Sequence, residues 1–285
     1  MSEPKRPGNL AHLERMLDQW SRSDAGQQAT VGRLRRMVAT SVLAAMLDGL
    51  DDHGVPRLAF KGGAGLEFRF GVSARATRDV DALVNVSIGE ALELIRERLV
   101  IGWEGFTGSV GEPTEITRAG IVPAPQRCKI KLLYKAKPFV TLDFEFGRSE
   151  PEVFELLELV PNAVPLERVL LAPGMPVLLL NVHFQIAQKL HACTEVPILG
   201  SNHRVHDLYD ILLLEPLARH DGIERTREAC VLTFDYRKRH AWPPPLVDWP
   251  DWRQLWDALD IPDGHRIDYG DARKQIEELI AVLAG

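Results

Sequence analysis

Cysteine is scarce in this sequence, with three residues in a chain of 285. The three lie far apart and form no Cys-x-x-Cys pair, which argues against a disulfide framework or a cysteine zinc site and favours a reducing cytoplasm. The N-terminal segment lacks the apolar stretch of a signal peptide. The longest apolar run, 176–182, is far shorter than the about 20 residues of a membrane span. We therefore expect a cytoplasmic protein that does not enter a membrane.

Positive charge is not in excess either. The net charge is −6 and uneven, because residues 1–150 hold 21 Lys and Arg against 19 Asp and Glu, whereas residues 151–285 hold 13 against 21. This excludes a strongly basic nucleic-acid-binding protein as a description of the whole chain, although it leaves room for a local basic patch. The sequence has no internal repeats, and with 45% apolar residues it can bury one large core or two smaller ones.

The spacing of apolar residues predicts a mixed fold. Steps of three and four residues indicate helices, and alternation indicates half-buried strands. The expected helices are 9–20, 30–53, 64–70, 88–99, 175–194, 203–214 and 271–283, and the expected strands are 55–60, 79–86, 128–134 and 139–146. We therefore expect an α+β protein with a small mixed sheet and helices in residues 1–150, followed by a mainly helical domain in residues 151–285.

Two glycines and two aspartates carry the first chemical signal. Gly62 and Gly63 follow a predicted strand and begin a helix, where exposed N–H groups and the absence of side chains favour a phosphate group. Asp79 and Asp81 are two residues apart on the next strand, so their side chains share one face. Paired carboxylates on a rigid strand suit Mg²⁺, which also binds phosphate oxygens of a substrate. This combination is typical of phosphoryl and nucleotidyl transfer.

A third carboxylate is available further along the chain. Thr141, Asp143 and Glu145 share one face of the strand expected at 139–146. If that strand lies beside the strand of Asp79, Asp143 could act as a general base on an attacking hydroxyl or complete the metal coordination.

Four segments between residues 55 and 215 together resemble a known family. They are Lys61-Gly62-Gly63-x-x-Leu66, Arg75-x-Thr77-x-Asp79-x-Asp81, the helical stretch 185–192 with Ala187-x-Lys189-Leu190-x-Ala192, and Arg204-x-x-Asp207-x-x-Asp210. Their order and spacing resemble the AbiEii/AbiGii nucleotidyltransferase toxins, including the MenT branch, within the DNA polymerase β-like nucleotidyltransferase superfamily.

The resemblance implies a role for each matching residue. Gly62 and Gly63 would bind the phosphates of an NTP, Asp79 and Asp81 would bind Mg²⁺, Lys61 and Lys189 would contact the triphosphate, and Asp207 or Asp210 would complete the nucleotide pocket from the helical half. Many relatives carry Ser or Thr directly after the glycine pair, whereas this chain has Ala64 and Gly65. Backbone N–H groups would then serve in place of a hydroxyl.

The resemblance also implies a toxin that adds a nucleotide to the 3′ end of tRNA and is paired with a cognate antitoxin. Three basic clusters suit a phosphodiester substrate. They are the strip Arg118, Arg127, Lys129, Lys131, Lys135 and Lys137, the group Arg33, Arg35 and Arg36, and the run Arg237, Lys238, Arg239 and His240. Candidate partners for stacking on unpaired bases are Tyr134, Trp242 and Trp249.

Other interpretations stay open at this point. The same pocket could modify a hydroxyl group of a protein or of a small molecule, or it could bind a nucleotide without turnover. Thr77 is either a loop hydroxyl or a regulatory site, since a phosphate there would compete with the substrate triphosphate. We expect a monomer.

Overall fold

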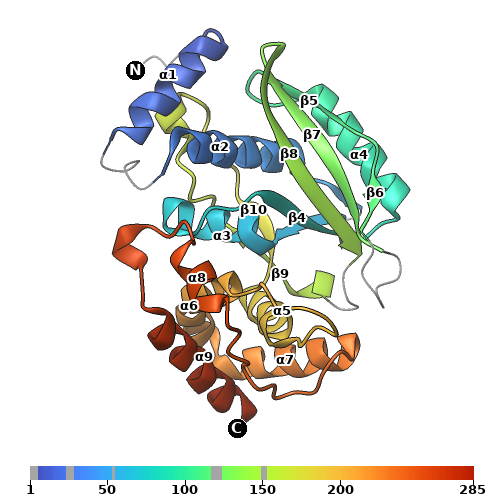
Figure 1. The fold of residues 1–285 in the computed structure, drawn as a ribbon. Helices are drawn as coiled ribbons and strands as arrows, with labels where there is room; N and C mark the ends of the chain where they lie inside the picture. The colour runs from blue at the N-terminus through green and yellow to red at the C-terminus, as the bar shows by residue number, and fades with distance from the viewer. Residues whose placement is uncertain (1–5, 24–28, 53–54, 117–123, 149–152) are drawn as a thin grey trace. The chain divides into compact units, whose positions relative to one another are not determined.

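The computed structural model describes residues 6–23, 29–52, 55–116, 124–148 and 153–285 (Figure 1). The chain divides into two compact units, Met1–Leu179 and Leu180–Gly285. The sequence placed this division after residue 150, whereas the structure places it after Leu179. The reason is that strand β10 pairs with β3, so the segment that leads to β10 stays with the first unit.

The first unit contains both strands and helices. Its helices are α1 (Leu10–Ser21), α2 (Val31–Met46), α3 (Gly62–Phe70) and α4 (Ile88–Ile101), with 3₁₀ turns at Gly71–Ser73, Val153–Leu156 and Leu166–Val169. Its strands are β1 (Asp51–Asp52), β2 (Val55–Pro56), β3 (Leu58–Lys61), β4 (Asp79–Val84), β5 (Phe106–Val110), β6 (Thr114–Glu115), β7 (Gln126–Tyr134), β8 (Lys137–Arg148), β9 (Leu157–Val160) and β10 (Val177–Leu180).

The described strands of this unit form an eight-stranded sheet in the order β5-β7-β8-β4-β3-β10-β9, with β6 beside β7, and a small separate hairpin of β1 and β2. Strand β4 runs parallel to β8 and antiparallel to β3, so the sheet is mixed. Helix α2 packs against β8, α4 packs against β5, and the two helices touch each other, so they cover the same face (Figure 1). The predicted α+β class is confirmed.

The alternation of side chains separates an apolar face of the sheet from a polar one. Val80, Ala82 and Val84 of β4 are buried in the core, whereas Asp79 and Asp81 lie on the other face and are partly exposed. Strand β7 repeats the pattern, with buried Cys128, Ile130 and Leu132 alternating with exposed cations. The core therefore fixes which way the charged side chains of the sheet point.

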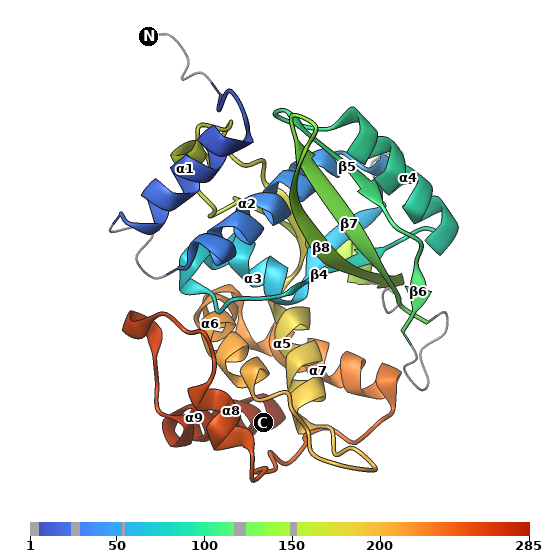
Figure 2. The same cartoon turned by 45° about the horizontal axis from the view of Figure 1, so that its top comes forward.

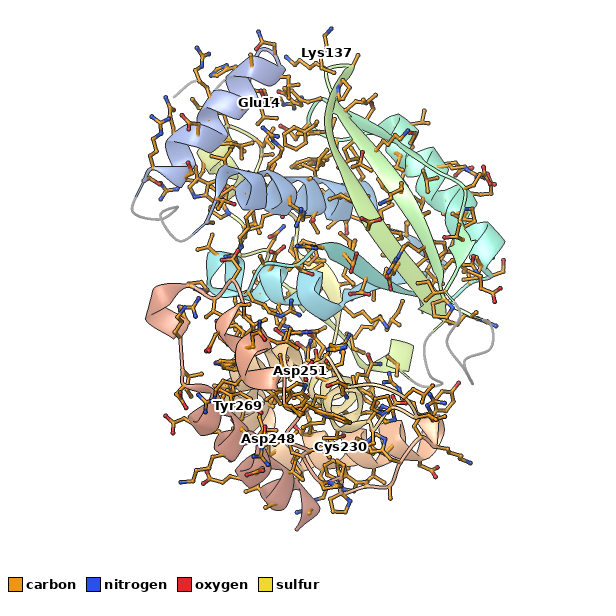
Figure 3. The ribbon with its side chains drawn as sticks, viewed as in Figure 1. Glu14, Lys137, Cys230, Asp248, Asp251 and Tyr269 are labelled. Carbon is orange, nitrogen blue, oxygen red and sulfur yellow. The ribbon has the colours of Figure 1, made fainter. Side chains whose placement is uncertain are left out.

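The second unit is helical. Its helices are α5 (Val182–Thr194), α6 (His206–Asp221), α7 (Ile223–Arg237), α8 (Trp252–Asp257) and α9 (Tyr269–Ala284), with a 3₁₀ turn at Asp263–His265. Helix α5 packs against α6 and α7, and α6 packs against α9 (Figure 2). The long segment after α7 is tied back by side chains, because Ser201 donates a hydrogen bond of 2.7 Å to Asp251, and Tyr269 donates one of 2.5 Å to Asp248 (Figure 3).

The helix expected over 175–194 is wrong in its first part, which forms strand β10. Asn181 ends the strand and begins α5, since its side chain accepts a hydrogen bond of 3.1 Å from the N–H of Phe184. The helix expected over 30–53 stops at Met46, where the chain turns into the β1–β2 hairpin.

The three cysteines are free and buried, so none of them forms a disulfide. Among the residues that the structure describes, no helix has the length and apolar character to cross a membrane.

Candidate active site

Four carboxylates lie on the polar face of the sheet, where β4 and β8 run side by side. The parallel register places Asp79 next to Asp143 and Asp81 next to Glu145. Neighbouring strands are about 4.8 Å apart, so each pair brings two carboxylates together. The expected adjacency of the two strands is thus confirmed, and the chemical role of Asp143 stays a prediction.

Cations of the neighbouring strand β7 flank these carboxylates. Lys129 forms an ion pair with Asp143, and the Nε atom of Arg127 donates a hydrogen bond of 2.9 Å to Glu145 Oε1. No role was predicted for Glu145, although its two-residue spacing from Asp143 put it on the same face. On the opposite side, Lys61 of β3 is the register partner of Asp81.

The pKa of Asp79 is raised above its ordinary value. Partial burial is the main cause, the negative charges of Glu145 and Asp143 add to it, and the positive charges of Arg127 and Lys129 oppose it. A divalent cation would relieve this crowding of negative charge, and carboxylate oxygens are the donors that Mg²⁺ prefers. The donor set therefore fits Mg²⁺.

In the described part of the chain, no three or more His, Cys, Asp or Glu side chains gather to hold a metal ion by themselves. Mg²⁺ at Asp79 and Asp81 would accordingly take further oxygens from a substrate, as this ion commonly does.

The two glycines make room for side chains of the same site. Gly62 has a φ of +62°, and a Cβ atom there would lie 3.0 Å from Asp81 Cγ and closer still to its carboxylate oxygen. A Cβ atom on Gly63 would lie 2.5 Å from Thr77 Oγ1. Helix α3 begins at this pair without a side-chain cap, so the N–H groups of its first turn face the site as potential anion donors.

A second charged cluster lies within the helical unit. Lys189 Nζ of α5 is 3.0 Å from Asp207 Oδ1 and 2.6 Å from Asp210 Oδ2 of α6. All three residues are buried, and Arg204 Nε donates a hydrogen bond of 2.7 Å to Asp207. The two aspartates, which are three residues apart and share a face of α6, thus orient Lys189. The roles predicted for these residues at the nucleotide stay predictions from the sequence.

The structure corrects one of the expected basic surface clusters. Arg33 is buried, Arg35 pairs with Glu14 at 3.1 Å, and Arg36 donates a hydrogen bond of 2.8 Å to the carbonyl group of Thr77. These arginines hold the first unit together instead of forming an exposed patch. The sequence could not show this, because the residues that contact these arginines are distant from them in the chain.

The proposed stacking role of Tyr134 is also wrong. Its ring is fully buried, and its hydroxyl group donates a hydrogen bond of 2.6 Å to the carbonyl group of Pro7. Arg118, the first residue of the basic strip predicted over residues 118–137, lies outside the described residues.

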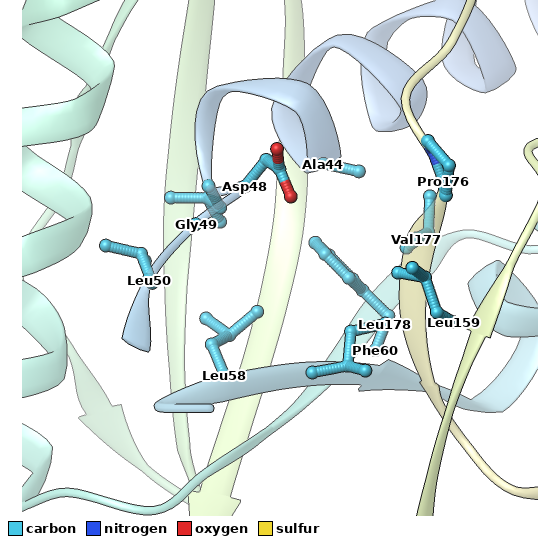
Figure 4. A pocket seen from close by; sticks show the side chains of 11 residues that line it. Ala44, Asp48, Gly49, Leu50, Leu58, Phe60, Leu159, Pro176, Val177 and Leu178 are labelled. Carbon is cyan, nitrogen blue, oxygen red and sulfur yellow. The ribbon is translucent and has the colours of Figure 1, made fainter. Parts of the chain in front are cut away.

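Two hollows differ in chemistry. In the second unit, a hollow of about 500 Å³ is lined by the predicted residues Lys238, Arg239, His240 and Trp242 together with Val231, Phe234, Asp235 and Ala241. In the first unit, a hollow of about 220 Å³ is lined mainly by apolar side chains, among them Leu58 and Phe60 (Figure 4). These two residues alternate with Lys61 along β3, so this apolar hollow lies on the sheet face away from the carboxylates.

Paired carboxylates on a mixed sheet, beside a helix that starts with two glycines, are the arrangement that nucleotidyl transfer needs. Over residues 46–281 the chain matches the family described as "Nucleotidyl transferase AbiEii toxin, Type IV TA system". The chain belongs to this family and is a nucleotidyltransferase toxin of a type IV toxin–antitoxin system, which implies an antitoxin partner.

One solved structure supports the fold. The MenT4 nucleotidyltransferase toxin of Mycobacterium tuberculosis H37Rv is similar with a TM-score of 0.52 and 20% identity, covering 96% of this chain and 99% of that one. An antigenic nucleotidyltransferase-like protein of Paracoccidioides brasiliensis matches with a TM-score of 0.40 and 18% identity over 73% of this chain and 89% of that one. A comparison with curated proteins found no match.

Gly62→Ala is expected to lower nucleotidyl transfer about 100-fold, because the added methyl group displaces the Asp81 carboxylate and small misplacements cost about that much. Steady-state transfer rates test this. Gly89→Ala is the matched control, since Gly89 is an exposed helical glycine with nothing within 4 Å of an added Cβ. If Gly62→Ala kept the rate of the control, the close packing of Asp81 against Gly62 would not matter for the reaction.

Lys189→Ala is expected to lower the free energy of unfolding by about 3–5 kcal/mol, because it removes the buried cation that pairs with both Asp207 and Asp210. Urea denaturation measures the change. Lys274→Ala serves as the control, since Lys274 is exposed in α9 and lies 3.8 Å from an exposed Glu278. Equal unfolding midpoints of the two variants would contradict the stabilising role of the cluster.

Proposed function

We propose that this toxin is a Mg²⁺-dependent enzyme that transfers NMP from an NTP to the 3′ end of an RNA, with tRNA as the acceptor, and thereby blocks translation. The observation that carries the proposal is the pairing of Asp79 with Asp143 and of Asp81 with Glu145 beside the start of α3. Carboxylates and uncapped N–H groups at one end of the central strands β3 and β4 supply the two partners that a nucleoside triphosphate and its cation need.

In the proposed reaction, the terminal ribose hydroxyl group attacks the α-phosphorus of the NTP. A new oxygen–phosphorus bond forms, the bond between the α-phosphorus and its bridging oxygen breaks, and pyrophosphate leaves. Asp143 accepts the proton of the hydroxyl group. Asp79 and Asp81 would hold Mg²⁺, which when bound offsets the negative charge of the phosphates.

Residues of both units would bind the donor. The N–H groups at Gly62 and Gly63 would donate to the phosphates, with Lys61 contributing a positive charge. Lys189, together with Asp207 or Asp210, keeps the nucleotide-binding role that the family resemblance implies.

Strand β7 supports an RNA acceptor. Its exposed cations Arg127, Lys129 and Lys131 are spaced at two-residue steps of about 6.7 Å and point from the same face as the carboxylates. Arg127 and Lys129 engage acidic side chains, whereas Lys131 lies between Ser109 of β5 and Thr141 of β8. Within the described part of the chain Lys131 has no carboxylate partner, so its charge is available to a phosphodiester.

The hollow of the second unit supports the same class of acceptor. The side chains of Lys238 and Arg239 bring positive charge to it, and the ring of Trp242 offers a surface for an unpaired base. Arg239 also forms an ion pair of 3.0 Å with Glu195. Cations combined with an aromatic ring favour RNA over the alternative acceptors, a protein hydroxyl group or a small molecule.

Thr77 keeps its proposed regulatory role. A phosphate on its hydroxyl group would place negative charge beside Asp79 and oppose the triphosphate. A cytoplasmic monomer also stays the expectation from the sequence.

The deciding experiment incubates the purified protein with Mg²⁺, total tRNA and each α-³²P-labelled NTP in turn. Label is expected on tRNA from one NTP and is expected to be absent with Asp79→Asn, because this variant loses one of the paired carboxylates. EDTA is expected to abolish labelling as well. Thermal unfolding of Asp79→Asn checks that the variant is folded.

Label on the protein itself or on an added small molecule would overturn the RNA acceptor and leave the transferase. Binding of NTP with no label on any acceptor would overturn turnover altogether. Undiminished labelling by folded Asp79→Asn would overturn the assignment of the site.

Lys131→Ala is expected to raise the KM for tRNA with little change in kcat, and to lower the slope of log affinity against log salt by about one, since one phosphate contact is lost. Filter binding at several salt concentrations measures the slope. Arg96→Ala is the control, because Arg96 lies on α4, which covers the other face of the sheet, and pairs with Glu93. Equal salt slopes for both variants would exclude Lys131 from the acceptor surface.

A further inference from the structure

Thr77 is held at each of its polar groups, directly before the carboxylates of the site. Its backbone N–H donates a hydrogen bond to the carboxylate of Glu67, and its carbonyl group accepts one of 2.8 Å from Arg36. Its hydroxyl group donates to the carbonyl group of Asp79 at 3.3 Å. Its side chain lies where a Cβ atom on Gly63 would be. Thr77 therefore connects the start of α3 to the start of β4.

The rest of the segment before β4 is held in the same way by helix α2. The guanidinium group of Arg33 donates hydrogen bonds to the carbonyl groups of Val72, at 3.2 Å, and of Ala74. Arg33 and Arg36 are three residues apart, so both reach the segment from one face of the helix. The contacts are all to backbone oxygens, so they fix the path of the segment whatever its side chains are.

Glu67 is the acidic centre of this arrangement. It is 2% exposed on α3, and its Oε1 atom lies 4.0 Å from Arg33 Nε. Arg33 and Arg36 face it from α2, Arg75 faces it from the segment before β4, and all three favour its charged form. Burial acts in the opposite direction and is the larger effect, so that the pKa of Glu67 rises to about 7.

We propose that Glu67 and Arg36 are positioning residues of the nucleotidyltransferase. By fixing Thr77 between Gly63 and Asp79, they set the distance between the N–H groups of α3, which receive the phosphates, and the carboxylates of β4, which receive the cation. Neither residue touches the substrate. This inference rests on the proposed function in one respect, namely that the donor NTP binds at the start of α3.

A buried carboxylate that served only to stabilise the fold would behave differently. The pKa of Glu67 in the folded protein is raised from the ordinary 4.5 to about 7, so its contribution to stability is present below pH 4.5 and is lost as the pH rises through 7. At pH 8 the ionised Glu67 carboxylate therefore destabilises the folded protein, although it holds Thr77 in place. Activity and stability are thus predicted to respond to Glu67→Gln in opposite directions.

The first test compares two adjacent arginines of α2. Arg36→Met removes the hydrogen bond to Thr77, whereas Arg35→Met removes only the ion pair with Glu14 of α1 (Figure 3). Arg36→Met is expected to speed the exchange of backbone amide hydrogens in residues 72–79 and to raise the KM for NTP about tenfold or more, as befits the loss of a charged hydrogen bond. Arg35→Met is expected to leave both quantities unchanged.

The second test uses Glu67→Gln, which keeps the shape and an acceptor oxygen but removes the charge. At pH 8 this variant is expected to unfold at the same or a higher temperature than the wild type and to transfer NMP about tenfold more slowly. At pH 6, where Glu67 of the wild type is mostly protonated, the two rates are expected to converge.

The outcomes separate this inference from the proposed function. Equal amide exchange in Arg36→Met and Arg35→Met, or a parallel loss of stability and activity in Glu67→Gln at both pH values, would overturn the positioning role. A wild-type protein that labels no acceptor would overturn the proposed function, whereas the amide exchange would still report whether Arg36 holds Thr77.

Discussion

The parallel pairing of β4 with β8 is the constraint on which the site depends. Its register brings Asp79 beside Asp143 and Asp81 beside Glu145, so two strands that are distant in sequence concentrate negative charge on one face. The apolar residues that alternate with them are buried, and a shift by one residue would turn every carboxylate into the core. The same packing that stabilises the sheet therefore fixes the direction of the carboxylates.

The two charged clusters of the chain differ in how far their charges are compensated. On the sheet, Arg127 and Lys129 engage Glu145 and Asp143, and partial burial together with these two carboxylates still raises the pKa of Asp79. In the helical unit, buried Lys189 and partly exposed Arg204 pair with the buried Asp207 and Asp210, so two positive charges meet two negative ones. The first cluster is suited to receive a cation, whereas the second joins α5 to α6 and compensates its own charge.

Local patterns predicted much of this arrangement. The two-residue spacing of Asp79 and Asp81, and of Asp143 and Glu145, gave the correct faces, since a strand alternates whatever its neighbours are. The same reasoning could not give the register between the strands, and it left Glu145 without a role. The order of segments from Lys61 to Asp210 identified the family, because each segment combines chemically functional residues with a recognisable secondary-structure pattern.

The errors arose where a distant part of the chain decides the outcome. Arg33 looked like part of a surface patch, and only the covering segment around Ala74 makes it a buried donor to carbonyl groups. The apolar run 175–194 fits either a helix or a buried strand, and pairing with β3 decides for a strand in its first part. Asn181 was the local sign of the boundary, since it is a favoured residue at the start of a helix.

The distance along the chain between β4 and β8 has a consequence for the timing of site assembly. Asp79 and Asp143 meet only after α4, β5 and β7 have been made and the parallel pair has closed. Contacts between such remote segments form slowly, because the intervening chain loses conformational entropy when the loop closes, before the contact can stabilise it. A ribosome that is still synthesising this toxin therefore carries separated carboxylates, and the paired carboxylates are complete only after translation has passed β8.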